Sequence, residues 1–263
     1  MKMFFNVLGA KIPAYGFFIA IGLCFIMLYL RYQKYYKELD FDTALSAMIY
    51  ALLIGGAGAK LLYWITDPSS FMILFDSKYP LLQRIQYSFS GGMVFLGGLI
   101  GAGIGVVLFL KKYKHIKPLK LLDMFAISMP ILQMFGRVGC FFAGCCYGRA
   151  SNSCIAVQFP KGGLAPAGVS VLPTQLFGVV GNFIIVITLL IYSKKNKHPG
   201  RIFGLYLIMY SIGRFILEFF RGDEIRGIYG ALSTSQWISI PLLVLGVILF
   251  VKAKEEVYEK NID

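Results

Sequence analysis

The stretch MPILQMFGRVGCFFAGCCYG, residues 129–148, is apolar enough to lie in a membrane but places Arg137 in its middle. A second stretch, LIMYSIGRFILEFFRGD, residues 207–223, does the same with Arg214. An arginine at the centre of a membrane helix costs about 2.5–3.5 kcal/mol, so such residues usually have partners and mark a functional site. The two stretches therefore predict a helical membrane protein with a site for an anionic ligand.

The composition of the whole chain supports the same class. Of the 263 residues, 57% are hydrophobic and only 15% are charged, and the mean hydropathy is +0.70. These values are typical of an all-α polytopic membrane protein, and we expect a single integral membrane domain over residues 1–263. The net charge of +13 could suggest nucleic-acid binding, but the cations lie in short runs between apolar stretches, as in juxtamembrane loops. We therefore expect no nucleic-acid partner.

Apolar stretches of about 20 residues predict seven transmembrane helices. We place them at residues 13–31, 43–65, 91–110, 119–138, 174–193, 202–220 and 234–251. The aromatic segment 68–88 carries charged residues and fits an interfacial helix or loop better than a span. The connection 149–173, rich in Gly, Ser and Pro, is expected to form either a small extracytoplasmic cap or an unstructured connector.

The distribution of lysine and arginine predicts the orientation of the chain. These residues collect in alternate connections, for example over residues 111–120 and 194–201. Connections of this kind usually face the cytoplasm, so the N-terminus is expected outside and the C-terminus in the cytoplasm. The first sixteen residues have too short an apolar part for a cleavable signal and are expected to lie along the outer interface.

The polar residues of the sixth span share one face. Tyr210, Arg214 and Glu218 follow each other at intervals of four, and Arg221 comes three residues later. Glu218 could serve only as a structural counter-ion for Arg214. One carboxylate cannot, however, neutralise Arg137 together with both arginines of this span. A surplus of positive charge in a low-dielectric site favours phosphate binding, for which guanidinium is well shaped.

Asp123 is the acidic residue of the fourth span. It precedes Arg137 by fourteen residues, which places it about 21 Å away along a helix, too far for an ion pair. We expect Asp123 to cap a helix or to pair with a juxtamembrane lysine.

The arginine-containing blocks resemble those of prolipoprotein diacylglyceryl transferases. The segment GRVGCFFAGCCYGR, residues 136–149, is similar in shape to the signature G-R-x-G-N-F-x-N-x-E-x-x-G of that family, and YSIGRFILEFFRGD, residues 210–223, is similar to its second arginine block. Further matches are Tyr15-Gly16, the glycine-rich GGMVFLGGLIG of residues 91–101, Asp123, and PTQL at residues 173–176. The resemblance extends over residues 13–245, in the order that the family has.

The resemblance implies a seven-helix enzyme of the bacterial plasma (inner) membrane, with its site towards the outer leaflet. Such enzymes transfer the diacylglyceryl group of phosphatidylglycerol to the lipobox cysteine thiol of a prolipoprotein and release glycerol 1-phosphate, without a cofactor. The partners it implies are thus phosphatidylglycerol, other membrane lipid and a lipobox peptide. By position, the catalytic residues would be Arg137, Arg214, Glu218 and Tyr210, and the substrate-binding residues Tyr15, Arg137, Gly139, Gly148, Gln175 and Arg221.

Three of the chain's departures from the family pattern bear on the chemistry. Leu96 replaces the motif histidine that is proposed to take the thiol proton, Cys140 replaces the signature asparagine, and Cys145 replaces the signature glutamate. Cys140 or Cys145 could therefore have a catalytic thiol role. Three other functions stay open: a related transferase for another acceptor or lipid, a non-catalytic protein that binds or moves phospholipid, and, with less support, a proton-coupled transporter.

Four cysteines lie close together in the sequence after the fourth span, with the spacing C-x4-C-C-x7-C. In an oxidising compartment, Cys154 could form a disulfide with Cys145 or Cys146. A thiol that takes part in catalysis is the alternative. A zinc site has less support because adjacent cysteines rarely suit tetrahedral ligation and no histidine is nearby. We predict no metal and no cofactor.

Overall fold

The computed structural model describes residues 4–7, 10–33, 36, 38–76, 78–90, 92–160, 165–196, 198–222 and 227–253. Gly91, which begins the expected third span, Lys197 and Asp223 lie outside these ranges. The chain divides into two compact units, Met1–Tyr36 with Leu119–Asp263, and Lys37–Pro118.

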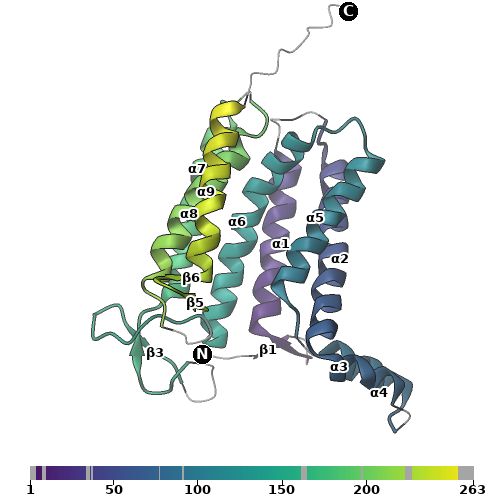
Figure 1. Cartoon of the computed structure of the whole chain (residues 1–263), viewed down its shortest axis with the longest axis vertical. Helices are drawn as coiled ribbons and strands as arrows, with labels where there is room; N and C mark the ends of the chain where they lie inside the picture. Colours follow the sequence, from purple (N-terminus) through teal and green to yellow (C-terminus); the bar gives the residue numbers. More distant parts are fainter. Residues whose placement is uncertain are drawn as a thin grey trace, which may run out of the picture. The chain divides into compact units, whose positions relative to one another are not determined.

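The larger unit contains five long helices and three short hairpins (Figure 1). The helices are α1 (Ala14–Tyr32), α6 (Pro118–Ala143), α7 (Thr174–Ser193), α8 (Arg201–Glu218) and α9 (Thr234–Lys252). The antiparallel hairpins are β1 (Phe4–Val7) with β2 (Ala10–Pro13), β3 (Val157–Gln158) with β4 (Ser170–Val171), and β5 (Ile228–Tyr229) with β6 (Leu232–Ser233). All three hairpins lie at the end of the unit where α1, α7 and α9 begin and where α6 and α8 end.

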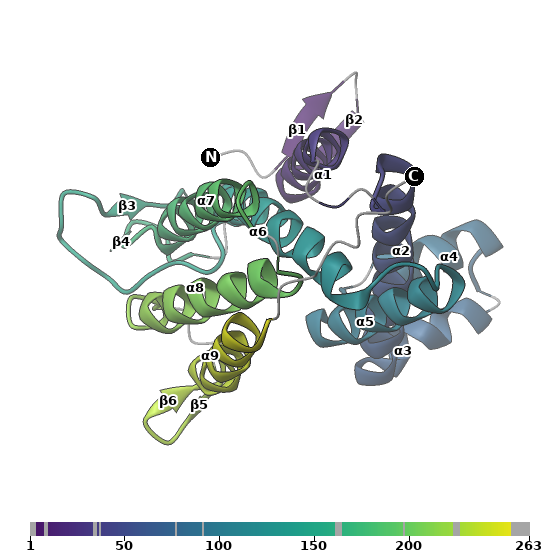
Figure 2. The same ribbon diagram turned by 90° about the horizontal axis from the view of Figure 1, so that it is seen from above.

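Helix α8 packs closely on α9 through two glycines, and α7 lies on its other side (Figure 2). A Cβ atom added to Gly204 would lie 2.9 Å from the carbonyl oxygen of Gly246, and one added to Gly246 would lie 2.9 Å from that of Gly204. Small residues of this kind are how membrane helices approach each other, because no hydrophobic effect drives helix association in lipid.

The smaller unit is a pair of long helices with a short amphipathic arm. It contains α2 (Phe41–Thr66), α3 (Pro68–Met72), the 3-10 helix η1 (Ile73–Phe75), α4 (Leu81–Ser90) and α5 (Phe95–Lys112). Helices α2 and α5 touch along glycines, since a Cβ on Gly58 would lie 2.4 Å from the carbonyl oxygen of Gly97. Near α4, the buried ammonium of Lys60 lies over the rings of Tyr63, Trp64 and Phe89. The arm formed by α3, η1 and α4 corresponds to the segment 68–88, which was expected to be an interfacial helix or loop.

The long helices match the seven expected spans closely. The expected fifth span has the bounds of α7, and most of the other expected ends differ from the helix ends by one to four residues. Within the described residues, five helices are long and apolar enough to cross a membrane, namely α1, α2, α6, α7 and α9. The protein is therefore a mostly helical polytopic membrane protein, while the count of seven spans and their orientation stay predictions.

The helix of the expected fourth span extends beyond residue 138. Helix α6 continues through Gly139 to Ala143, and Gly144 follows in a left-handed conformation with φ 69°. Gly139 lies inside the helix, where its lack of a side chain lets α1 approach closely. A Cβ there would lie 3.0 Å from Cα of Tyr15. A left-handed glycine is the usual stop signal of a helix, and here it is Gly144.

Asp123 caps a helix, but not its own. Its carboxylate accepts hydrogen bonds from the backbone N–H groups of Gly200 (2.8 Å) and Phe203 (2.7 Å) at the start of α8, and from the hydroxyl of Tyr36 (2.6 Å). Unpaired N–H groups and the helix dipole favour a carboxylate at this position. Asp123 thus joins α6, α8 and the end of the segment after α1, and the capping alternative from the sequence is confirmed.

The described part of the connection after α6 is folded rather than extended. Phe159, Ala165 and Val171 form a small buried cluster on which Phe141 and Tyr147 pack. The β3–β4 hairpin and the backbone pairing of Gly148 with Arg221 fix this segment to the end of α8. The hairpin β1–β2, which the sequence analysis did not predict, lies in the first thirteen residues.

Candidate functional site: arginines and cysteines at one end of the larger unit

The polar stripe of α8 forms an ion-pair network. Nη2 of Arg214 lies 3.0 Å from Oε2 of Glu218, and Nη1 of Arg221, just after the helix, lies 3.7 Å from the same oxygen. The Glu218 side chain is 1% exposed, against 14% for Arg214 and 12% for Arg221. The predicted stripe therefore exists, with one buried carboxylate between two guanidinium groups.

The two terminal nitrogens of Arg214 differ in their hydrogen-bond partners among the described residues. Besides Glu218, its Nη2 donates to Oγ of Ser235 at the start of α9 at 2.6 Å. Its Nη1 is buried and has no hydrogen-bond partner among the described residues. A buried N–H donor without a partner is costly, and such a group is suited to an acceptor on a ligand.

Arg137 approaches this network from α6. Its aliphatic part packs on α7 at Gly178, where a Cβ atom would lie 3.2 Å from Cγ of Arg137. The charges of Arg137 and Arg221 both act on Arg214. Three guanidinium groups thus share the site with the carboxylate of Glu218, which leaves the surplus of positive charge that the sequence predicted.

Two tyrosines extend the site along the helices. Tyr210 stacks on Tyr206, with ring centroids 5.7 Å apart, and the Tyr206 hydroxyl accepts a hydrogen bond from Gln133 of α6 at 3.1 Å. Tyr15, at the start of α1, is 50% exposed and lies against Gly139. Its hydroxyl interacts electrostatically with Arg137, so it belongs to the same end of the unit.

Gly148 is a packing position in the structure. A Cβ atom there would lie 2.6 Å from the carbonyl oxygen of Leu172 and 2.8 Å from that of Phe220. Its N–H donates to the Leu172 carbonyl at 2.8 Å, and it pairs with Arg221 across an antiparallel bridge. The glycine therefore lets three backbone segments meet and sets the position of Arg221, while its expected contact with substrate stays a prediction.

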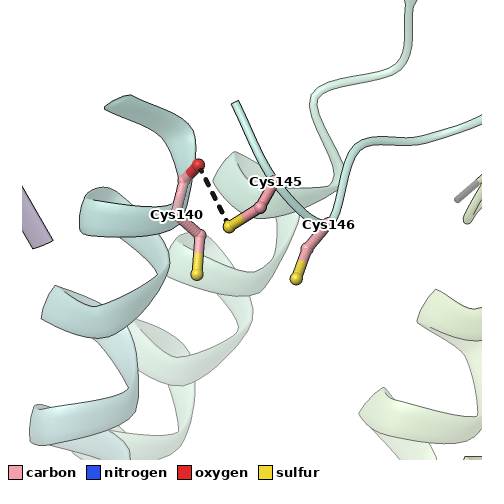
Figure 3. Close-up of side chains that lie close together, drawn as sticks. All are labelled: Cys140, Cys145 and Cys146. Carbon is pink, nitrogen blue, oxygen red and sulfur yellow. Dashed lines mark hydrogen bonds between the residues drawn. The ribbon is translucent and has the colours of Figure 1, made fainter. Parts of the chain in front are cut away.

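Three cysteines gather beside the arginines, and we call Cys140, Cys145 and Cys146 the cysteine cluster. Cys140 lies in the last turns of α6, and the other two follow the helix (Figure 3). Their Sγ atoms all lie within 4.8 Å of one another, and the Cys145 thiol donates to the Cys140 carbonyl at 3.7 Å. Cys24 and Cys154 are exposed, and all five cysteines are free thiols. The structure thus contains no disulfide between Cys154 and Cys145 or Cys146.

Two buried side chains at the start of α7 hold the cluster loop. Oγ1 of Thr174 donates to the Cys146 carbonyl and Nε2 of Gln175 donates to the Cys145 carbonyl, both at 2.7 Å. Gln175 is fully buried at 0% exposure. Gln175, predicted to bind substrate, therefore supports the cysteine loop through its amide nitrogen.

The thiols of the cluster differ in acidity. Hydrogen bonding from Cys140 and Cys145, together with the positive charges of Arg137 and Arg221, lowers the pKa of the Cys146 thiol. The thiolate is the reactive form of cysteine and the form that binds metals. Cys146, which does not replace a family residue, is therefore the thiol on which the positive charge of these arginines acts.

Leu96 lies in the smaller unit, near the start of α5, and is 56% exposed. The sequence assigned no role at this site to Ser235 or Thr174. Each lies in the first turn of its helix, Thr174 in α7 and Ser235 in α9. Only the folded chain shows that Thr174 reaches the cysteine loop and that Ser235 reaches Arg214.

The fold and the site define an α-helical membrane protein with a cationic, cysteine-bearing site at one end of its helices. A family model described as prolipoprotein diacylglyceryl transferase matches residues 2–252. The chain therefore belongs to the prolipoprotein diacylglyceryl transferase family, as the motifs predicted.

Proteins from three clostridia illustrate the relationship, and each carries the name phosphatidylglycerol–prolipoprotein diacylglyceryl transferase. The Clostridium perfringens protein, the one numbered 2, is 40% identical over 262 residues, which cover 97% of this chain and 98% of the relative. The Clostridium tetani protein is 37% identical, with coverage of 94% and 95%. The Clostridium novyi protein is 34% identical, with coverage of 95% and 94%.

Proposed function

We propose that this protein transfers the diacylglyceryl group of phosphatidylglycerol to the lipobox cysteine of a prolipoprotein and releases glycerol 1-phosphate. In this reaction the substrate thiol attacks the glyceryl carbon that carries the phosphate. A carbon–sulfur bond forms, the carbon–oxygen bond to phosphate breaks, and the phosphate leaves with the electron pair. The membership of the family and the names of the relatives support this substrate pair.

The observation that carries the proposal is the unpaired donor on Arg214. Its buried Nη1 lacks a partner among the described residues, while Arg137 and Arg221 add positive charge around it. The departing phosphate gains negative charge in the transition state, and fixed cations in a dry site stabilise this charge strongly. In our proposal Arg137, Arg214 and Arg221 bind the phosphate of the lipid headgroup.

The other predicted residues have supporting roles in the proposal. Glu218 fixes Arg214 and Arg221 in position and, with Tyr210, is a candidate for proton transfer, while Tyr15 contacts the headgroup. Gly139 and Gly148 allow α1 and the end of α8 to approach the site. The geometry also favours phosphate over an uncharged ligand, since guanidinium groups donate paired hydrogen bonds to phosphate oxygens.

We infer that the chain crosses the plasma membrane seven times with the site towards the outer leaflet. Tyr15, Arg137 and Glu218 lie at the end of the larger unit that carries the three hairpins. Arg201 and Lys252 lie at the other ends of α8 and α9. Because cytoplasmic ends of spans are rich in lysine and arginine, this second end would face the cytoplasm.

A reconstituted assay tests the function. Purified protein in phosphatidylglycerol vesicles is mixed with a lipobox peptide, and the lipidated peptide and glycerol 1-phosphate are measured together. We expect the two products in equal amounts, and neither with a lipobox peptide in which serine replaces cysteine. Binding of phosphatidylglycerol without either product would instead favour a lipid-binding protein.

A further inference from the structure

The phosphate chemistry leaves the cysteine cluster without a role. A zinc ion is bound by thiolates at about 2.3 Å, which in a tetrahedron places the sulfur atoms about 3.8 Å apart. The three Sγ atoms lie within 4.8 Å of one another already, so each pair has to approach by at most about 1 Å to reach this spacing. The cluster is thus close to the arrangement of three zinc ligands.

The backbone conformation at Cys146 allows adjacent cysteines to face one zinc ion. Cys146 has φ 57°, and among the described residues it is the non-glycine residue with a positive φ. This left-handed conformation brings the Sγ atoms of Cys145 and Cys146 to the same region as that of Cys140 (Figure 3). A non-glycine residue in this region is strained, and such strain is typical of functional sites.

The loop that carries the thiols is also supported from behind. The carbonyl groups of Cys145 and Cys146 accept hydrogen bonds from the buried Gln175 and Thr174. Metal sites characteristically have such outer partners, which fix the orientation of the ligands before the metal binds. The cysteine cluster thus has the ligand spacing and the support of a metal site.

We propose that the cysteine cluster binds a zinc ion through three thiolates and leaves the fourth coordination position for the thiol of the lipobox cysteine. Three protein ligands with one open position are typical of catalytic zinc, whereas structural zinc has four protein ligands. This inference rests on the proposed transferase function. In it, the zinc ion activates the lipobox thiol.

The charges of the neighbourhood suit this arrangement. Arg137 and Arg221, which we propose to bind the phosphate, act electrostatically on Cys146. Zinc with three thiolates has one net negative charge, and a fourth thiolate makes two, so nearby guanidinium groups offset the excess. The same arginines thereby bring the phosphate end of the lipid close to the metal-bound thiol.

The step balances without an oxidant or a base from the family histidine. The lipobox thiol loses its proton to water as it binds the metal, and its sulfur lone pair then forms the bond to the glyceryl carbon. The bond between that carbon and the phosphate oxygen breaks, and glycerol 1-phosphate carries away the electron pair. Zinc keeps its charge, and the thioether product, a weaker ligand than a thiolate, dissociates. Leu96 at the histidine position is then no obstacle.

Metal analysis of the purified full-length protein is the first test. We expect about one zinc per chain after purification with a non-chelating reductant. Replacement by cobalt should give a thiolate-to-cobalt charge-transfer band and the intense visible bands of tetrahedral cobalt. Cys140→Ser, Cys145→Ser and Cys146→Ser should each lower cobalt affinity at least tenfold, while Cys24→Ser and Cys154→Ser, at exposed thiols, should bind as the wild type does. Equal cobalt binding in all five variants would overturn the proposal.

Addition of a lipobox peptide to the cobalt protein tests the open position. The visible bands should shift with the cysteine peptide and stay unchanged with the serine peptide. An unchanged spectrum with both peptides would overturn the activating role of the metal.

The transfer assay separates this inference from the proposed function. Transfer by a protein that contains no metal and is insensitive to chelators would refute the zinc site and leave the transferase intact. Cobalt binding by the three cysteines without any transfer would refute the transferase function and the activating role, and leave a metal site.

Discussion

Arg214 and Glu218 lie one helical turn apart on α8, with Nη2 of the arginine 3.0 Å from Oε2 of the glutamate. The carboxylate also faces Arg221, so it orients two guanidinium groups rather than neutralising one. Nη1 of Arg214 is buried and has no hydrogen-bond partner among the described residues. The ion pair therefore fixes the Nη2 side of Arg214 and leaves the Nη1 donor for a ligand.

Arg214→Gln should lower kcat/KM for diacylglyceryl transfer by about 10²–10³-fold, the usual loss when one donor to a developing negative charge is removed. The matched control is Ser235→Ala, which removes the 2.6 Å partner of Nη2 but keeps the guanidinium. We expect the control to lose less than tenfold. Steady-state kinetics with phosphatidylglycerol vesicles measures both, and equal losses would contradict the phosphate-binding role.

Asp123→Ala should lower the free energy of unfolding by about 1–3 kcal/mol, because the N–H groups at the start of α8 lose a buried acceptor. The residue lies at the opposite end of α8 from Glu218, so transfer per folded molecule should stay within about twofold. Denaturant unfolding in detergent and the transfer assay measure the two effects. A loss of transfer without a loss of stability would indicate proton coupling through Asp123.

Gln175→Met should weaken cobalt binding about 10–100-fold, the usual effect of removing an outer partner of a metal ligand. The variant keeps the side-chain length but removes the donor to the Cys145 carbonyl. Competition with a chelating dye measures the affinity. Unaltered cobalt affinity in the folded variant would show that Gln175 does not support the metal site.

Gly58→Ala should destabilise the smaller unit, since the new methyl group would lie 2.4 Å from the backbone oxygen of Gly97. Gly56→Ala is its matched control on the same helix, because no described heavy atom outside the adjacent backbone of that helix lies within 4 Å of a Cβ there. Alanine is favoured over glycine in a helix by about 1 kcal/mol, so the control should be neutral or stabilising. Thermal unfolding compares them, and equal melting temperatures would contradict the close α2–α5 packing.

The helices of this protein could be predicted from the sequence because an apolar stretch of fixed length has few alternatives in a membrane. The stripe of Tyr210, Arg214 and Glu218 was equally predictable, since helical periodicity alone places these residues on one face. The end of α6 was not, because the sequence does not tell Gly139, which admits Tyr15, from Gly144, which ends the helix.

The arrangement of the cysteine cluster could not be predicted from the sequence. Adjacent cysteines rarely suit tetrahedral ligation when the backbone between them has an ordinary conformation. The left-handed Cys146 and the hydrogen bonds from Thr174 and Gln175 depend on contacts across 28 and 30 residues of chain. No local pattern contains that information, so the sequence favoured a disulfide or a catalytic thiol over zinc, and no metal was predicted.

The central claim is that guanidinium groups held by Glu218 drive the release of phosphate as a thioether forms. The most direct measurement follows glycerol 1-phosphate and the lipidated peptide in one reaction, with wild-type protein and with Arg214→Gln, in phosphatidylglycerol vesicles. Our account predicts equal amounts of the two products from the wild type and a loss of both by at least about a hundredfold in the variant. Undiminished release of both products by Arg214→Gln would contradict it.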